Sequence, residues 1–433
     1  MKKLFNRLVA ISLLMSSLVY SQEEKKPIAE VASQKQISLE DAIRLTQCYN
    51  GAIRSSILTY EQALTQYKIT FGAILPTADI SYVHNSTSGS KSTDTFNGLL
   101  AWTISDTTSE YFNIQRAKCD IESARFDTIN TIRNTLLSVF EQYYTVITTK
   151  ELYEINKDLV QQTRVFLANA KKTIKPEKWA EEFVLLGEGN MANGVTDELS
   201  QKAAVTTTRA ALRASIGVDQ QCELPEILPI DFTDDPQWEM PLKDIISEAC
   251  KCNPVLNSLR KQICSQELKV REAQITARFK ARIEAAHTHD IERLDSRGTS
   301  SLMLTVTLPI FSGFVNEETI CLNKQILASL RQDLLQAERD LVSGIKSNYQ
   351  TLMCNIKRMK AAKAAVQANR LNHQAAIDKE MTVYDVDFAR DLINIAEANY
   401  RDAYYNGVWL TMMKLYAQMG RELPYENINL CCN

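Results

Sequence analysis

Hydrophobic residues in this chain recur first with a helical period and then with a strand period, and this order of patterns occurs twice. From Ser38 to Ile74 the apolar residues follow helical spacing. Ser38 is a suitable N-cap, and acidic residues occupy the turn that follows it. Pro76 ends the pattern, so we expect one continuous helix over residues 38–74.

From Thr77 the period of the pattern changes to two, which predicts strands. A polar loop over residues 85–95 separates the first two strands. The alternating apolar positions of the four expected strands are Ala78, Ile80, Tyr82 and His84, then Leu100, Trp102 and Ile104, then Ala281, Ile283, Ala285 and His287, and finally Leu302, Leu304, Val306 and Leu308. Each strand is about ten residues long, which is the length that a tilted transmembrane strand needs.

Four strands are too few for a membrane barrel, because known membrane barrels start at about eight strands. An open strand edge is not tolerated in lipid either. If these strands enter a membrane, the chain must therefore oligomerise. The alternative is an ordinary soluble sheet packed on a helix, although no obvious partner for the polar face is found in the sequence.

Two very long helices are predicted over residues 109–175 and 316–381, where Pro and Gly are almost absent. At 1.5 Å per residue each helix would be about 100 Å long. The apolar residues form a narrow stripe, which is typical of coiled coils: Leu136, Leu137, Phe140, Tyr144 and Ile147. Turns near residues 175–176 and 379–382 lead into return helices, and the glycines between 187 and 194 predict a break in the first of them.

Landmarks of the two halves line up at a constant displacement, which indicates a duplicated unit. Ser38 corresponds to Pro241, Ile80 to Ile283, His84 to His287 and Gly217 to Gly420. We therefore divide the chain into a secretory signal peptide (1–21), a leader (22–37), repeat 1 (38–217), a linker (218–240), repeat 2 (241–420) and a C-terminal tail (421–433). The signal rests on a basic start, an apolar core and a small-residue cleavage pattern.

Composition adds limits to this layout. In 433 residues there are only 13 Gly and 10 Pro, so turns are few and elements are long. The net charge of -3 and the lack of a basic cluster in the mature part argue against nucleic acid as a partner. After residue 22 no apolar run approaches 18 residues, which argues against a helical membrane protein.

Candidate chemistry is sparse, and we expect neither an enzyme nor a cofactor. The ten cysteines fit no compact disulfide framework and no zinc-type pairs, so free or intermolecularly paired thiols are favoured over a metal site. His287 and His289 lie on one strand face and could bind metal, but a solvated strand end is the favoured interpretation. Gly187-Glu188-Gly189 lacks the strand before it and the lysine after it that a phosphate loop needs.

The layout resembles the TolC-type outer-membrane efflux family over nearly the whole mature chain. The resemblance rests on the repeat starts, on Leu75-Pro76 before the first strand, on the run from Leu308 to Gly313 before the second long helix, and on the repeat ends at Gly217 and Gly420. It implies a mainly α fold with a small β part, in which long coiled-coil helices and four membrane strands per chain form, in a homotrimer, one shared twelve-stranded β-barrel and one α-helical tunnel.

The resemblance also implies a gate, a location and partners. A ring of aspartates constricts the far end of such tunnels, and the run from Thr382 to Phe388 places Asp385 in register with the family pattern and Asp387 one residue early. Lys379 stands where the family favours glycine. The implied location is the outer membrane, extending into the periplasm, with membrane lipid, a periplasmic adaptor protein and an inner-membrane transporter as partners.

We therefore expect an outer-membrane channel-tunnel that exports drugs, small molecules or proteins. The main alternative is a secreted coiled-coil envelope scaffold or adhesin with the sheet as a soluble tip. A metal-binding envelope protein that uses the histidines and cysteines is a third possibility.

Overall fold

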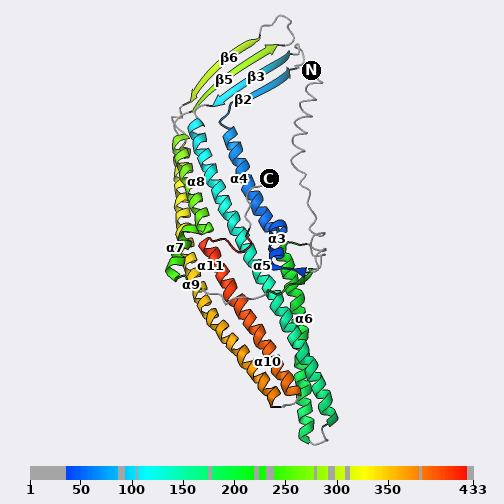
Figure 1. The fold of residues 1–433 in the computed structure, drawn as a ribbon. Helices are drawn as coiled ribbons and strands as arrows, with labels where there is room; N and C mark the ends of the chain where they lie inside the picture. Colours follow the sequence, from blue (N-terminus) through cyan, green and yellow to red (C-terminus); the bar gives the residue numbers. More distant parts are fainter. Residues whose placement is uncertain are drawn as a thin grey trace.

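The computed structural model describes residues 36–85, 93–103, 106–173, 178–218, 224–230, 238–276, 280–290, 298–307, 313–379 and 383–426. The predicted signal peptide and most of the leader lie outside these residues, as does the end of the C-terminal tail. The molecule is elongated, with one sheet at one end and two helical hairpins reaching the other (Figure 1).

Each repeat supplies two short-to-medium helices, two strands and a long helical hairpin. Repeat 1 contains α3 (Leu39–Tyr49), α4 (Gly51–Gly72), β2 (Thr77–Asn85), β3 (Thr93–Thr103), α5 (Asp106–Thr173) and α6 (Lys178–Ile216). Repeat 2 contains α7 (Leu242–Cys252), α8 (Pro254–Thr276), β5 (Lys280–Asp290), β6 (Thr299–Thr307), α9 (Val315–Asp378), α10 (Val383–Asp402), the π-helical η1 (Ala403–Trp409) and α11 (Leu410–Met419). The predicted long helices are confirmed as α5 and α9.

The prediction of a single helix over residues 38–74 is wrong, because the helix is interrupted at Asn50. The start is confirmed: Ser38 and Asp41 form a capping box at the beginning of α3. Asn50 then leaves the helical conformation, with φ -65° and ψ 124°, and its Oδ1 accepts hydrogen bonds from the backbone N–H groups of Ala52 and Ile53. Asn50 therefore ends α3 and caps α4.

The predicted break between residues 187 and 194 is also wrong, since α6 continues through this stretch. Gly187 and Gly194 instead allow α6 to approach α5 closely. A Cβ on Gly187 would lie 2.5 Å from a methyl carbon of Leu167, and one on Gly194 would lie 3.1 Å from a methyl carbon of Val160. Glycine weakens an isolated helix, but at these two positions the close packing of α5 leaves little or no room for a larger residue.

The four strands form one antiparallel sheet in the order β2-β3-β5-β6, so the strand pairs of the two repeats join through β3 and β5. The strand β3 begins at Thr93, which shortens the loop that was predicted over residues 85–95. Ile104 and Leu308, predicted as strand positions, lie outside the described residues. A second, two-stranded sheet pairs β1 (Gln36–Ile37) in parallel with β4 (Glu226–Ile227), and so joins the leader to the linker.

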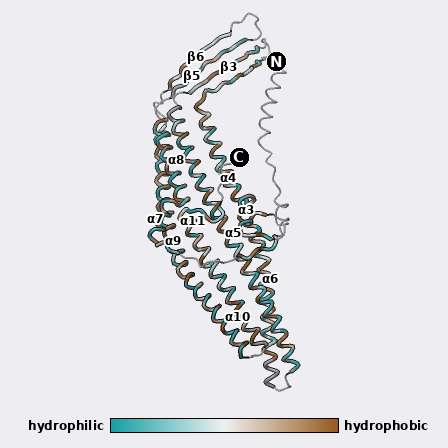
Figure 2. The backbone as a smooth tube through the Cα atoms, viewed as in Figure 1, coloured by the Kyte–Doolittle hydropathy of each residue, from teal (hydrophilic) through white to brown (hydrophobic). Residues whose placement is uncertain are grey.

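The hydrophobic core lies at the waist of the molecule, where α3, α5, α7, α9, η1 and α11 meet. The predicted stripe of α5 is confirmed there: Leu136, Phe140 and Tyr144 are fully buried. Tyr144 stacks on Tyr405 of η1 with ring centroids 4.0 Å apart. Teal and brown residues alternate along the long helices in Figure 2, so their apolar residues form stripes rather than continuous blocks.

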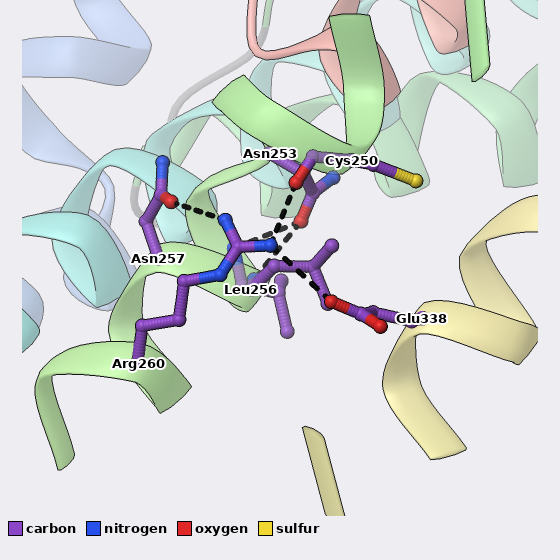
Figure 3. Close-up of polar contacts among 7 residues, drawn as sticks. Cys250, Asn253, Leu256, Asn257, Arg260 and Glu338 are labelled. Atoms are coloured by element: carbon purple, nitrogen blue, oxygen red, sulfur yellow. Dashed lines mark hydrogen bonds and ion pairs between the residues drawn. The ribbon is translucent and has the colours of Figure 1, made fainter. Parts of the chain in front are cut away.

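Repeat 2 has a set of hydrogen bonds around Arg260 that an isoleucine at the matching position of repeat 1 cannot make. Arg260 of α8 donates hydrogen bonds to the Cys250 carbonyl oxygen at the end of α7, to the Asn257 side chain and to Glu338 of α9, at 2.8, 3.0 and 3.2 Å (Figure 3). The guanidinium thus satisfies a carbonyl at a helix end and links three helices. The matching position of repeat 1 is Ile57, which packs against the core.

Candidate functional site

The four-stranded sheet has one apolar face and one polar face. Residues paired directly across an antiparallel ladder lie on the same face. The apolar face therefore consists of Ala78, Ile80, Tyr82, Phe96, Leu100, Trp102, Ile283, Ala285, Leu302, Leu304 and Val306, with a few polar residues at its loop end. Leu302 is 78% exposed and Ile80 75%, so none of the residues that the structure describes covers these side chains.

Polar groups bound the apolar face at both ends. At the loop end, His84 Nδ1 lies 2.5 Å from Asp94 Oδ1, and His287 Nδ1 lies 2.9 Å from Ser300 Oγ. At the helix end, the Trp102 indole N–H donates to the Ile74 carbonyl oxygen at 3.2 Å. A band of apolar residues between two polar or amphipathic margins matches the cross-section of a bilayer.

The opposite face of the sheet is mostly polar. Arg282 and Glu284 form an ion pair at 2.5 Å on β5, and Thr305 and Thr307 lie on the same face of β6. The sequence prediction of alternating apolar and polar faces is thus confirmed on all four strands.

The sheet has two edge strands, β2 and β6, whose outer backbone groups pair with no other strand among the described residues. Because four strands alternate in direction, β2 and β6 run in opposite directions. An edge of this kind is a template for pairing with another chain. Two copies could therefore join β2 to β6 as an antiparallel pair.

The predicted gate residues Asp385 and Asp387 lie in the first two turns of α10, directly after the chain reverses from α9. Their side chains lie outside the described residues, so the gate stays a prediction. Lys379, at the position where the resemblance favours glycine, is the C-cap of α9, with φ -90° and its N–H donating to the Ala375 carbonyl oxygen. The structure thus places both aspartates at the end of the molecule opposite the sheet (Figure 1).

Two polar contacts hold the hairpins together between the waist and this end. Arg401 of α10 lies 3.1 Å from Glu151 of α5, and Gln162 of α5 donates to Asp391 of α10 at 3.3 Å. Burial raises the pKa of the Glu151 carboxyl, and the charge and hydrogen bond of Arg401 oppose this shift only in part. These contacts were not predicted, because they join residues that are more than two hundred positions apart.

The structure describes seven of the ten cysteines and all four histidines that were suggested for metal binding. Among the residues that the structure describes, no three His, Cys, Asp or Glu side chains form a group that could hold a metal ion. His287 and His289 share the apolar face of β5 at its loop end. None of the described helices is long and apolar enough to cross a membrane.

Comparison with known proteins identifies the fold. No family model and no curated protein sequence matches the chain. Among solved structures, the Campylobacter jejuni CmeC outer membrane channel superposes with a TM-score of 0.73 and 14% identity over 88% of this chain and 85% of that one. The open state of the Neisseria gonorrhoeae MtrE outer membrane channel superposes with a TM-score of 0.68 and 15% identity, over 88% of this chain and 89% of that one. The Vibrio cholerae outer membrane protein VceC superposes with a TM-score of 0.68 and 12% identity, over 88% of this chain and 96% of that one.

These likenesses show that the chain has the fold of outer-membrane channel proteins. The predicted resemblance to the TolC type is confirmed at the level of the fold. At 12–15% identity the likeness is one of architecture.

Proposed function

We propose that this chain is one subunit of a trimeric outer-membrane channel that exports substrates across the periplasm to the cell exterior. The observation that carries the proposal is the exposed apolar face of a sheet mounted on a fold that outer-membrane channels share. An apolar face of this size is unstable in water and stable in lipid.

Trimerisation follows from the edges of the sheet. Lipid supplies no hydrogen bonds for the free edges of β2 and β6, so the edges must pair with other copies. Three copies supply twelve strands, enough to close a barrel with every β2 paired to a neighbouring β6. The long helices also expose apolar residues that neighbouring copies would cover, such as Leu186 of α6 and Leu371 of α9, 64% and 72% exposed.

The helices of three copies would form a tunnel that continues from the barrel into the periplasm. The end of the tunnel that carries Asp385 and Asp387 would face an inner-membrane transporter, with a periplasmic adaptor protein around the joint. Energy for export would come from that transporter. The gate would be the ring that Asp385 and Asp387 of three subunits form around one axis.

The alternative is a secreted coiled-coil scaffold or adhesin with the sheet as a soluble tip. The exposed fractions of Ile80, Leu302, Leu304 and Val306 disfavour it, because a soluble tip would bury or replace such residues. The cargo is a separate question, since drugs, small molecules and proteins all fit a passive tunnel.

The test separates these functions by fractionation and conductance. We expect the native protein to partition with the outer-membrane fraction, to migrate as a trimer by native mass spectrometry in detergent, and to give discrete conductance steps in planar bilayers. A protein that stays in aqueous buffer without detergent and gives no conductance would establish the scaffold alternative. Deleting the gene and comparing exported proteins with sensitivity to toxic compounds then identifies the cargo class.

A further inference from the structure

The helix α5 of repeat 1 packs along α8 of repeat 2, and the two helices run in opposite directions. Ser123 Oγ of α5 lies 3.0 Å from Ser258 Oγ of α8. Nearer the sheet, Arg116 of α5 lies 3.0 Å from Glu272 of α8. As the residue number rises on α5 it falls on α8, which fixes an antiparallel register between the two contacts.

Cys119 and Cys264 lie between these two contacts, one on each helix. Glu122 and Lys261 form an ion pair one turn away, in the same register. The register places the two thiols opposite each other, and Cys264 is close enough to Cys119 to contribute to the raised pKa of the Cys119 thiol. Both thiols are free in the structure and both are partly buried.

We propose that Cys119 and Cys264 form a disulfide that joins α5 of repeat 1 to α8 of repeat 2. The oxidant is a protein disulfide of the kind that an oxidising compartment maintains. One cysteine thiolate attacks a sulfur of the oxidant, which forms a mixed disulfide and releases one oxidant thiol. The second cysteine then attacks the mixed disulfide and releases the other oxidant thiol, so the two cysteines lose two electrons and two protons and the oxidant gains them.

The cross-link would fasten the sheet-proximal half of the helical layer. It closes a loop over residues 119–264, which contains the rest of α5, all of α6, the linker, α7 and the start of α8, so it constrains the unfolded chain strongly. It also joins the two repeats at a place where α5 and α8 make several polar contacts: Ser123 with Ser258, Arg116 with Glu272 and Glu122 with Lys261. Movement of the hairpins would then be confined to the part below the cross-link.

The surroundings of the pair set its reactivity. Burial, together with the contact to Cys264, raises the pKa of the Cys119 thiol to about 12, while the nearby Lys261 acts in the opposite direction and Asp120 in the same one. The thiolate is the attacking form, so exchange in the folded protein should be slow at neutral pH and faster at higher pH. The pair is therefore suited to a lasting structural cross-link rather than to rapid redox sensing.

The test is a peptide map of the full-length protein after oxidation. The purified protein is reduced, transferred to oxidised glutathione at pH 8.5, quenched with acid, alkylated in denaturant and digested with trypsin. Cleavage after Lys118, Arg125, Lys261 and Lys269 gives peptides 119–125 and 262–269, each with a single cysteine. We expect a disulfide-linked form of these two peptides that disappears on reduction. We also expect reduction to lower the temperature at which the trimer dissociates on heating by about 5 °C.

Matched variants make the result specific. Cys119→Ser and Cys264→Ser should each remove the linked peptide and the effect of reduction on thermal stability. Cys321→Ser, at an exposed thiol on α9, should change neither. The proposal is overturned if both peptides are recovered alkylated after oxidation, or if either cysteine is found joined to a different one.

Discussion

Asn50 ties the start of α4 to the end of α6, because its Nδ2 donates a hydrogen bond to the Ser215 carbonyl oxygen at 2.7 Å. The same relationship recurs in repeat 2, where Asn253 Nδ2 donates to the Gln418 carbonyl oxygen at 2.9 Å. In both repeats the asparagine Oδ1 also accepts from the two backbone N–H groups that begin the next helix. The duplication seen in the sequence is thus preserved down to single hydrogen bonds.

This relationship predicts a cost for removing either asparagine. Asn50→Ala loses a helix cap and leaves the partly buried Ser215 carbonyl without this donor, so we expect the free energy of unfolding to fall by about 2 kcal/mol. Asn50→Asp keeps the cap acceptor but turns a carboxylate oxygen toward the Ser215 carbonyl oxygen, so it should also be destabilising. Guanidinium unfolding in detergent measures the change, and Asn253→Ala should give a similar value. A cost for Asn50→Ala no greater than for the exposed Thr59→Ala would contradict the prediction.

Two glycines support these asparagines by close approach. Gly217 has φ +88°, and a Cβ on it would lie 2.8 Å from both Asn50 Cα and the Tyr49 carbonyl oxygen. Gly420 has φ +78°, and a Cβ on it would lie closer still to the backbone of Cys252. We expect Gly217→Ala to destabilise the protein by about 1–3 kcal/mol and to reduce the yield of assembled oligomer. Gly51→Ala is the control: a Cβ there meets nothing within 4 Å, so the variant should be neutral or slightly more stable.

The sequence predicted the helices and strands that follow from local pattern. It did not predict features that involve contacts with residues far away in the chain. The apolar spacing of Tyr49 and Ile53 continues across Asn50, so periodicity alone hides the break. Pro254, directly after Asn253, was the available signal, because proline favours the first position of a helix and the repeats align there. The π-helical segment had no such signal. Within it the Gly407 carbonyl oxygen accepts from Asn355 of α9 at 2.9 Å, a contact between residues 52 positions apart.

The candidate site also has features that follow from local pattern and features that depend on distant contacts. Alternation alone assigned the two faces of the sheet, because strand faces follow from a period of two. The Glu151 contact with Arg401 and the facing pair Cys119 and Cys264 join different repeats, so only the folded chain brings them together. For Asp385 and Asp387 the position on α10 was predictable from the turn that precedes them, whereas their arrangement around an axis depends on an assembly.

The two faces of β6 provide a matched pair of substitutions. Leu304 lies on the apolar face and Thr305, its neighbour, on the polar face. We expect Leu304→Arg to cost roughly 2–4 kcal/mol in a bilayer and to impair assembly, and Thr305→Arg to be much milder. The measurement is the fraction of oligomer in outer membranes at equal expression. Equal tolerance of both variants would rule out the membrane assignment of this sheet.

The partly buried carboxyl of Glu151 predicts a pH dependence. Its pKa is raised in the folded protein by burial, so the folded state binds this proton more tightly than the unfolded state does. The stabilising contribution is complete below the unfolded pKa and is lost as the pH rises through the raised folded pKa. Glu151→Gln should therefore remove part of the decline in unfolding midpoint as the pH rises above the ordinary glutamate pKa. Glu154→Gln, one turn away and exposed, is the control, and an identical pH profile for wild type and Glu151→Gln would contradict this account.

The last prediction concerns the proposed gate. Asp385 and Asp387 begin α10 just after the long helix α9 reverses, at the end opposite the sheet. In a trimer each position would contribute three carboxylates around one axis, whose negative potential favours cations over anions. Hard divalent cations prefer oxygen ligands and should block such a ring.

The double variant Asp385→Ala, Asp387→Ala should thus lower cation selectivity and weaken block by Mg²⁺, with Asp385→Ala alone giving the larger single effect. Single-channel recordings in planar bilayers measure both, and Asp333→Ala, Asp340→Ala on α9 removes the same charge elsewhere. Unchanged reversal potentials and unchanged block in the Asp385 and Asp387 variant would place the constriction at other residues.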